Sequence, residues 1–245
     1  MPIYLLIFAF DVVLMIHAIK TGRFSPWFYV ILMLPGLGGA IYVVVELIPE
    51  WTGSHKGRKA RQQIASALNP MGKYRALADQ LAIVDTISNR AALAQEALNL
   101  GRFDKAREHY HMILERPLGD EPAYMLGKAR AEYGMNRFAD GIASLEELKA
   151  RWPDFQSADG HLLYAMALER AGRNDEALSN YQGVGAYFPG AEPRVRQAQL
   201  LARLGRAEEA RKVTADVVLT LGRAAAYVRR NQKQWLSEAK KLAAG

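Results

Sequence analysis

The stretch that decides the fold is Leu100-Gly-Arg-Phe-Asp-Lys-Ala106, because close variants of it recur three more times along the chain. The variants are Met135-Asn-Arg-Phe-Ala-Asp-Gly141, Ala171-Gly-Arg-Asn-Asp-Glu-Ala177 and Leu204-Gly-Arg-Ala-Glu-Glu-Ala210. Their final residues are separated by 35, 36 and 33 positions. A period of this length indicates a helical repeat array, in which each unit buries its apolar face against the next.

The residues around each phrase share further features. A small residue precedes the end of each phrase by twelve positions, at Ala94, Ala129, Ala165 and Ala198. Tyr110 and Tyr181 follow the end of a phrase by four positions, and Pro153 and Pro189 close the second and third units. This pattern resembles tetratricopeptide repeats over residues 85–221, although Asn136 and Gly141 depart from it. The resemblance implies about four antiparallel helix pairs, packed closely at the small residues and stacked into an α-solenoid.

The first 50 residues differ from the rest, because they hold two apolar runs, 3–19 and 26–48. At 1.5 Å of rise per residue, a helix over the first run spans roughly 25 Å, and one over the second spans more than 30 Å. Only Lys20-Thr-Gly-Arg-Phe-Ser25 separates them, which allows a tight antiparallel hairpin. No Lys or Arg precedes the first run and no small-x-small site follows it, so a cleaved signal peptide is disfavoured. The sequence therefore predicts an all-α chain with an N-terminal transmembrane hairpin ahead of the solenoid.

Charge around the apolar runs predicts the orientation of the hairpin. The segment after the second run carries four cations that we expect to contact anionic lipid headgroups: Lys56, Arg58, Lys59 and Arg61. The connecting loop carries only Lys20 and Arg23. Because positive flanks stay on the cytoplasmic side, we expect the repeats to lie in the cytoplasm, at a bacterial inner membrane.

The second apolar run contains Trp27 and then Pro35-Gly-Leu-Gly-Gly-Ala-Ile-Tyr42. This pattern resembles the N-terminal two-helix domain of cardiolipin synthases and related phospholipase D-type proteins. The His-x-Lys-x-x-x-x-Asp motifs that carry the chemistry of that family are absent from this sequence. The resemblance therefore implies a membrane module, including Gly38, and no phosphatidyl transfer.

Asp11 is the one acidic residue in the first run, and an antiparallel hairpin places it at the depth of residues 35–37. A charge at mid-bilayer is costly, so one hypothesis is that a neutral Asp11 donates a hydrogen bond to the backbone around Ile31, which Pro35 leaves short of a partner. The alternative is that Asp11 faces another protomer, which would make the hairpin a site of homo-oligomerisation.

These patterns divide the chain into four parts. The expected boundaries are 1–50 for the hairpin, 51–84 for a basic juxtamembrane linker with lead-in helices, 85–222 for the repeats and 223–245 for a basic capping helix. The last segment mixes many cations with a few apolar side chains, as the solvated end of a repeat array requires.

The sequence offers no constellation for catalysis or metal binding. It has no cysteine, which excludes disulfides, thiolate chemistry and zinc ribbons. It also lacks a phosphate-binding glycine loop, a nucleophile elbow and a His-Glu-x-x-His helix. His109 and His111 are two residues apart on a predicted helix, so they point to different faces. We therefore expect no enzyme activity, cofactor or metal, and the net charge of +7 comes without a nucleic-acid-binding motif.

The tetratricopeptide resemblance implies a groove lined by the first helix of each unit. The positions that it assigns to this groove are Gln95, Asn99, Arg130, Tyr133, Glu169, Arg170, Gln199 and Arg203. Three arginines with amides and a tyrosine favour an acidic or extended peptide ligand; the alternative is that they only solvate an open face.

The leading functional hypothesis is thus a membrane-anchored scaffold that recruits a protein or peptide partner. Two alternatives remain open from the sequence. One is a non-catalytic accessory or regulator of cardiolipin-type phospholipid synthesis, which rests on the hairpin. The other is an assembly factor for envelope or cytochrome biogenesis.

Overall fold

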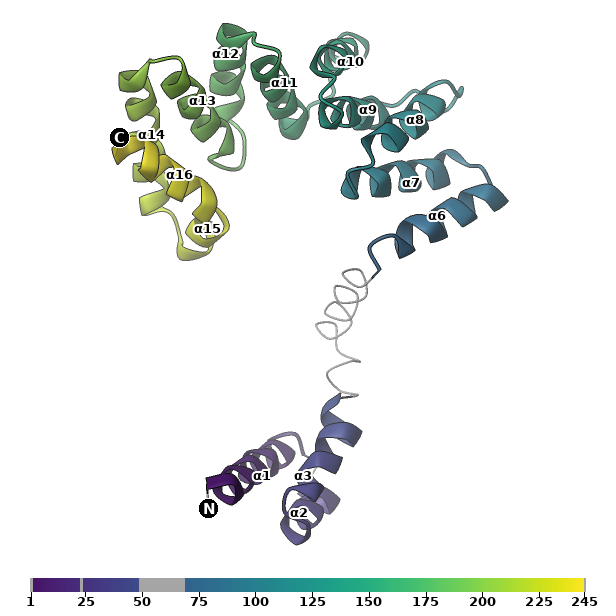
Figure 1. The fold of residues 1–245 in the computed structure, drawn as a ribbon, viewed down its shortest axis with the longest axis vertical. Helices are drawn as coiled ribbons and strands as arrows, with labels where there is room; N and C mark the ends of the chain where they lie inside the picture. Colours follow the sequence, from purple (N-terminus) through teal and green to yellow (C-terminus); the bar gives the residue numbers. More distant parts are fainter. Residues whose placement is uncertain (1, 23, 49–68, 245) are drawn as a thin grey trace. The chain divides into compact units, whose positions relative to one another are not determined.

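The computed structural model describes residues 2–22, 24–48 and 69–244, and within these residues every regular element is helical. The chain divides into two compact units, Met1–Gly72 and Lys73–Gly245. Figure 1 shows the helices of both units along the sequence.

The N-terminal unit contains α1 (Pro2–Lys20), α2 (Phe24–Met33), α3 (Leu37–Tyr42) and a π-helical segment, Val43–Leu47. Helix α1 packs against both α2 and α3, as a hairpin requires. The core of this unit consists of four buried residues, Leu14, Ala18, Ile31 and Tyr42.

The second apolar run is not one continuous helix, which corrects the sequence expectation. Helix α2 ends at Met33, and α3 begins only after Leu34-Pro35-Gly36. Pro35 has no N–H to donate, and Gly36 adopts a φ of 81°, which a residue with a side chain rarely reaches. The run is therefore divided into helical pieces of 10, 6 and 5 residues. Of the helices in the described part of the chain, none combines the length and the apolar character needed to cross a membrane, so the two expected spans are not found there.

The second unit begins with α6 (Gly72–Ile83), where the sequence predicts a lead-in helix, and continues as four helix pairs. The pairs are α7 (Ile87–Asn99) with α8 (Phe103–Leu114), α9 (Pro122–Gly134) with α10 (Phe138–Arg151), α11 (Ala158–Arg170) with α12 (Asn174–Gly185), and α13 (Glu192–Arg203) with α14 (Ala207–Arg223). The second helix of each pair also packs against the first helix of the next pair, which builds the predicted solenoid.

The recurring phrase forms the turn inside each pair. Its second residue has a positive φ in every unit: 69° at Gly101, 60° at Asn136, 79° at Gly172 and 76° at Gly205. The N–H of the following arginine then returns to a carbonyl of the first helix, for example from Arg102 to Ala97 at 2.8 Å and from Arg137 to Glu132 at 2.9 Å. This is the hydrogen bond of a glycine-type helix end. Asparagine tolerates the left-handed region, so the second unit keeps the same turn.

The small residues that the sequence singles out are fully buried between the helices. Ala94, Ala129, Ala165 and Ala198 have no exposed surface. Tyr110 and Tyr181 are also buried. Alanine at these positions lets the two helices of a pair approach, because a larger side chain would hold them apart.

After α14 the chain forms α15 (Ala226–Asn231) and α16 (Lys233–Ala244). The sequence predicts one capping helix here, and the structure has two short ones. Helix α16 packs on α13 and α14, with Trp235, Leu236 and Ala239 against Val195, Val217 and Leu221. It covers the apolar surface that a fifth repeat would otherwise bury.

Candidate functional site

The residues assigned to the groove lie on the first helices of the four pairs: α7, α9, α11 and α13. Within α7, α9 and α13 the two assigned residues are three or four positions apart, so they lie on the same side of their helix. Gln95, Asn99, Arg170 and Arg203 are exposed, and Arg130, Tyr133, Glu169 and Gln199 are half-buried. The structure thus leaves all eight side chains at least partly accessible.

In the first repeat these side chains mainly bind one another. Gln95 donates to Asn99 at 3.2 Å and accepts from the hydroxyl of Tyr110 at 3.4 Å. Asn99 donates to the buried carboxylate of Glu96, 3.2 Å away, which also pairs with Lys73 of α6 at 2.5 Å. The amides at this end are therefore largely satisfied within the protein.

Arg130 links the second repeat to the third. Its Nη2 lies 3.7 Å from Oδ2 of Asp159, at the start of α11. The Asp159 side chain is 71% exposed and that of Arg130 is 39% exposed. A long, exposed ion pair of this kind contributes little to stability, so a ligand carboxylate can replace Asp159 at small cost.

Arg170 has a different environment, since its partners are aromatic. Its guanidinium carbon lies 5.1 Å from the centre of the Phe138 ring, which Tyr133 contacts edge-on at 5.5 Å between ring centres. Arg170 forms no ion pair with any carboxylate in the described part of the chain. The Phe138 ring orients this guanidinium and leaves its five donors free.

Glu169 ties three helices together beside Arg170. Its carboxylate accepts from the hydroxyl of Tyr181 on α12 and from the guanidinium of Arg203 on α13. Burial raises the pKa of Tyr181 well above its usual value, and the hydrogen bond to Glu169 raises it further. Tyr181 is thus held as a hydrogen-bond donor, which fixes the carboxylate that Arg203 contacts.

Sequence reasoning missed Glu132, a buried acid on α9. It accepts from the Oγ of Ser144 at 2.6 Å and from the Nε of Arg107 at 3.2 Å. The equivalent positions in the other repeats hold Ala97, Leu168 and Leu201. An acid at a position that is otherwise apolar was the signal in the sequence. Its contacts lie between helices and give it a structural role.

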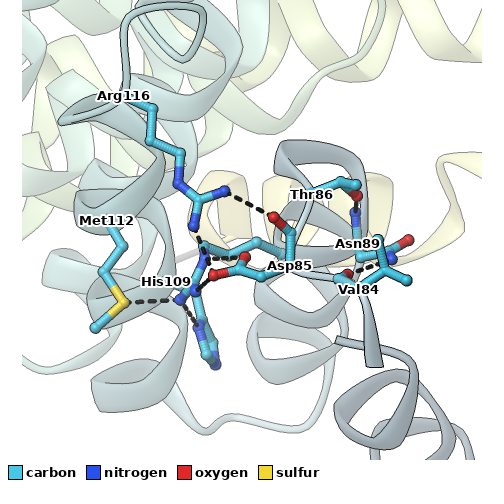
Figure 2. Close-up of polar contacts among 8 residues, drawn as sticks. Val84, Asp85, Thr86, Asn89, His109, Met112 and Arg116 are labelled. Atoms are coloured by element: carbon cyan, nitrogen blue, oxygen red, sulfur yellow. Dashed lines mark hydrogen bonds and ion pairs between the residues drawn. The ribbon is translucent and has the colours of Figure 1, made fainter. Parts of the chain in front are cut away.

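A second cluster that the sequence did not reveal surrounds Asp85, which precedes α7 (Figure 2). Its carboxylate binds Arg90 at 2.5 Å and Arg116 at 2.7 Å, and these two hydrogen bonds, with Arg90 first, lower the pKa of Asp85. Arg90 also lies 3.4 Å from Nδ1 of His109 and 2.7 Å from Sδ of Met112. Burial, and then the charge of Arg90, lower the pKa of His109.

The Asp85 cluster joins the two ends of the first repeat, because Arg116 follows α8 and Asp85 precedes α7. The second repeat has an equivalent contact, in which Arg151 donates to Asp120 across the same interval of 31 residues.

The two nearby histidines have different neighbours: His109 lies beside Arg90, whereas His111 lies 3.3 Å from Glu115. Where the structure is described, no three His, Cys, Asp or Glu side chains gather as they would around a metal ion.

In the N-terminal unit Asp11 is 3% exposed and contacts the break between α2 and α3. Its Oδ2 accepts a hydrogen bond from the backbone N–H of Gly36 at 2.6 Å, and its Oδ1 has no partner. The hypothesis that Asp11 donates to the backbone around Ile31 is therefore wrong. Gly36 is the first N–H after Pro35, so the carboxylate instead caps the start of α3.

Of the other residues of the module, Trp27, Gly38 and Tyr42 lie on the same inner side. Tyr42 is fully buried, its hydroxyl is 2.9 Å from Nδ1 of His17, and its ring contacts that of Trp27 at 5.3 Å. Trp27 in turn donates to Glu46 at 3.0 Å. A Cβ on Gly38 would lie 2.3 Å from the carbonyl oxygen of Val30, so this glycine permits the contact with α2. Pro35 itself is exposed.

The outside of this unit is apolar. Side chains at least half exposed include Leu5, Phe8, Phe10, Val13, Ile19, Leu32, Met33, Leu37, Val44 and Val45. The interior thus combines an apolar core with a few polar contacts, and the many exposed apolar side chains are unusual for a protein in water. The four cations expected to contact headgroups, Lys56, Arg58, Lys59 and Arg61, lie outside the described residues.

Comparison with known proteins supports the repeat assignment. Residues 91–155 and 126–187 each match a family model described as tetratricopeptide repeat. Residues 91–187 therefore carry tetratricopeptide repeats. A crystal structure of a thermophilic tetratricopeptide repeat protein from Thermus thermophilus has the same fold, with a TM-score of 0.54 and 16% identity, over 75% of this chain and 97% of that one. No curated protein matches the sequence.

The family model confirms the tetratricopeptide resemblance over residues 91–187, and the crystal structure supports the fold. Repeats of this kind are typical of protein-interaction scaffolds, which generally carry no catalytic chemistry of their own. The family-model match does not reach the N-terminal unit, and the likeness of that unit to the cardiolipin synthase module stays a prediction.

Proposed function

We propose that this protein is a membrane-anchored scaffold that recruits a partner through the exposed side of α9, α11 and α13. The observation that carries the proposal is Arg170, an exposed cation stacked on Phe138 with no carboxylate partner in the described part of the chain. Guanidinium groups held in this way bind carboxylates in two-point contacts.

The neighbouring arginines extend this surface. Arg130 is only loosely paired with Asp159, and 60% of the Arg203 side chain is exposed although it contacts Glu169. A partner segment with spaced acidic residues would meet Arg130, Arg170 and Arg203 on successive repeats. The expected ligand is therefore an acidic segment of a protein, and no catalytic step is assigned to the chain.

Photo-crosslinking in membranes tests the groove. A photoreactive amino acid is placed at residue 199, one turn before Arg203 on α13, and the crosslinked partner is identified by mass spectrometry. Arg170→Ala combined with Arg203→Ala should reduce that crosslink at least tenfold. Arg137→Ala combined with Arg173→Ala removes the same charge from turn arginines that pair within their own helices with Asp140 and Glu176. Equal loss in both double variants would reject the groove as the binding surface.

The anchoring part of the proposal rests on the apolar exterior of the N-terminal unit. Its buried polar contacts and apolar exterior fit a surrounding of lipid acyl chains. Together with the basic residues after the hairpin, this supports a place in the bacterial inner membrane, with the repeats on the cytoplasmic side and anionic lipids at the flank. The resemblance to the cardiolipin synthase module points to the same environment.

Two measurements test the anchoring. The full chain should float with vesicles of anionic phospholipid and resist extraction by carbonate, whereas a chain with Phe8→Gln, Val13→Gln and Val44→Gln should be extracted. A reporter fused after Arg61 should be active only in the cytoplasm. Extraction of the unaltered chain by carbonate would reject the anchor, and a reporter active only outside the cytoplasm would reject the orientation.

A further inference from the structure

The end of the chain carries a charge that the repeats do not, and we call residues 223–245 the cap. They hold six cations and a single acid, Glu238, and so supply most of the net charge of +7. In the repeats, the turn arginines lie beside an acid three residues later, as Arg137 lies beside Asp140. In the described part of the cap, only Lys241 pairs with an acid, Glu238 at 2.9 Å. The positive charge of the cap is therefore mostly uncompensated.

Three of these cations border a shallow hollow between α14 and α16. The hollow has a volume of about 450 Å³, and its lining includes Val218 and Leu219 of α14 and Lys240 of α16. Arg223 follows Leu219 by one turn of α14, and so it lies on the side of the hollow. Lys233 precedes Lys240 by two turns of α16 and lies on the same side of that helix. All three cations are exposed, and none pairs with a carboxylate of the described residues.

Helix stability does not account for Lys233. It is the first residue of α16, where the unpaired backbone N–H groups give the helix end a partial positive charge. A cation is unfavourable at this end, and the first turn of α16 contains no acidic residue to offset it. The position of Lys233 therefore favours an anion from outside the protein.

Apolar side chains are exposed among these cations. Leu219 at the hollow is 51% exposed, and Tyr227 of α15 is 67% exposed. Trp235 does not join them, because it packs into the core under α16 and the guanidinium of Arg196 lies 5.4 Å from its ring centre. A surface that stacks nucleic-acid bases needs several exposed aromatic rings, and the described part of the cap offers one. Cations mixed with a tyrosine and a leucine are instead typical of side chains in the headgroup region of a bilayer.

We propose that this part of the chain binds the surface of an anionic phospholipid bilayer. We call it the cap face, and its residues are Leu219, Arg223, Tyr227, Lys233 and Lys240. The three cations pair with headgroup phosphates, and the two apolar side chains enter the layer between headgroups and acyl chains. A second copy of the chain would bring like charges together, which opposes association through this face. The contact rests on the proposed function only for the presence of a bilayer, and it does not require insertion of the N-terminal unit.

A fluorescent label at the hollow tests the contact. The chain has no cysteine, so Ala243→Cys, at a residue that lines the hollow, accepts a single label whose emission depends on the polarity around it. Ala150→Cys, at an exposed residue of α10, carries the same label as a control. Each labelled full chain is mixed with nanodiscs of phosphatidylcholine, or of phosphatidylcholine with phosphatidylglycerol, and the emission spectra are compared.

We expect the label at residue 243 to emit at shorter wavelength only with discs that contain phosphatidylglycerol, and this shift should weaken as salt is added because ions screen the attraction. The label at residue 150 should not shift. An equal shift with phosphatidylcholine alone, or at residue 150, would overturn the proposal. Inorganic phosphate and a single-stranded DNA oligonucleotide should each leave the emission unchanged. A shift with either would assign the cap face to a small anion or to nucleic acid, and would also overturn it.

Charge variants separate the cap face from general attraction. Lys233→Glu with Lys240→Gln should abolish the shift, while the thermal midpoint should not fall, because a carboxylate is favourable at the start of α16. Arg75→Glu with Lys149→Gln makes the same change of charge at exposed residues outside the cap and should keep the shift. Equal shifts in the two double variants would overturn the proposal.

Size-exclusion chromatography of the same samples distinguishes this contact from the anchor. A chain that separates from phosphatidylcholine discs rejects the anchor, and the cap face is still tested by the shift with phosphatidylglycerol. A chain that stays with the discs but shows no shift at residue 243 overturns the cap contact and leaves the anchor in place.

Discussion

Glu132 on α9 accepts a hydrogen bond from Ser144 on α10 at 2.6 Å, inside the second repeat, where Glu132 is 1% exposed. Arg107 of the first repeat donates to the other oxygen of the same carboxylate at 3.2 Å. One buried charge therefore joins the two helices of one repeat to the repeat before it. The other repeats have Ala97, Leu168 and Leu201 at this position, so the array itself does not require the charge.

Removing Ser144, a hydrogen-bond donor to Glu132, should lower the free energy of unfolding more than removing Ser144 and Glu132 together. Ser144→Ala leaves the buried carboxylate short of a hydrogen bond, and we expect the free energy of unfolding to fall by about 1–3 kcal/mol. Combining it with Glu132→Leu, which introduces the residue type of the third repeat, should recover most of this loss because the buried charge is gone. Urea unfolding of both single variants and the double variant measures the coupling. If Ser144→Ala were equally costly in the Glu132→Leu background, the hydrogen bond would not be the cause.

The turn residues should respond in opposite directions. At Asn136, with a φ of 60°, glycine should relieve backbone strain and raise the free energy of unfolding by up to about 1 kcal/mol. At Gly172, with a φ of 79°, alanine should lower it by about 1–2 kcal/mol. Gly183→Ala is the control: this glycine is inside α12 with open space around it, so alanine should be neutral or stabilising. Loss of stability in Asn136→Gly would contradict this account of the turn.

The His109 environment should make stability depend on pH. Burial and Arg90 lower the pKa of His109 from 6.5, so the unfolded chain takes up a proton at a higher pH than the folded chain. The stabilisation of the folded state by neutral His109 is complete above pH 6.5, and it is lost as the pH falls from there towards the folded pKa of His109. The difference between urea midpoints at about pH 7.5 and about pH 5.5 should therefore shrink in His109→Gln.

Glu176→Gln is the matched control for that measurement, because Glu176 is not among the charges that act on His109. A hydrogen bond from Arg173 lowers the pKa of Glu176 from 4.5, so its contribution is present above that value and is lost only as the pH falls through the folded pKa. This window lies below the lower pH of the comparison. The control should thus leave the difference between the two midpoints unchanged, and an effect as large as that of His109→Gln would assign the pH dependence elsewhere.

Close packing in the N-terminal unit should make Gly38 intolerant of a side chain. A Cβ there would meet backbone atoms, 2.3 Å from the oxygen of Val30 and 2.8 Å from the Cα of Ile31, and backbone cannot rotate away as a side chain can. Gly38→Ala should lower the thermal midpoint of the unit in detergent by several degrees, measured by differential scanning fluorimetry. The exposed Ala40→Val is the control. An unchanged midpoint in Gly38→Ala would contradict the packing of α3 on α2.

Local sequence was enough to predict the repeat array, because each turn depends on a few adjacent residues. The position of Gly101 and its counterparts, and the alanines twelve residues before the end of each phrase, mark where helices end and approach. The expectation that the second apolar run of the hairpin forms one continuous helix was wrong. Average apolarity there outweighed Pro35, whereas in the structure the pair Pro35-Gly36 ends α2.

The candidate sites were less predictable, since they depend on partners distant in sequence. The sequence offered Arg130, Arg170 and Arg203 as equivalent groove cations. In the structure Arg203 contacts Glu169, 34 residues earlier, and Arg170 alone stacks on Phe138.

The sequence by itself determined the helical repeats and their turns, because positive φ, small contact residues and helix periodicity act within a few positions. Only the tertiary structure decided which charges are paired and that Asp11 caps α3 at Gly36. Those outcomes depend on side chains brought together from different helices, and the packing of the helices sets which of them meet.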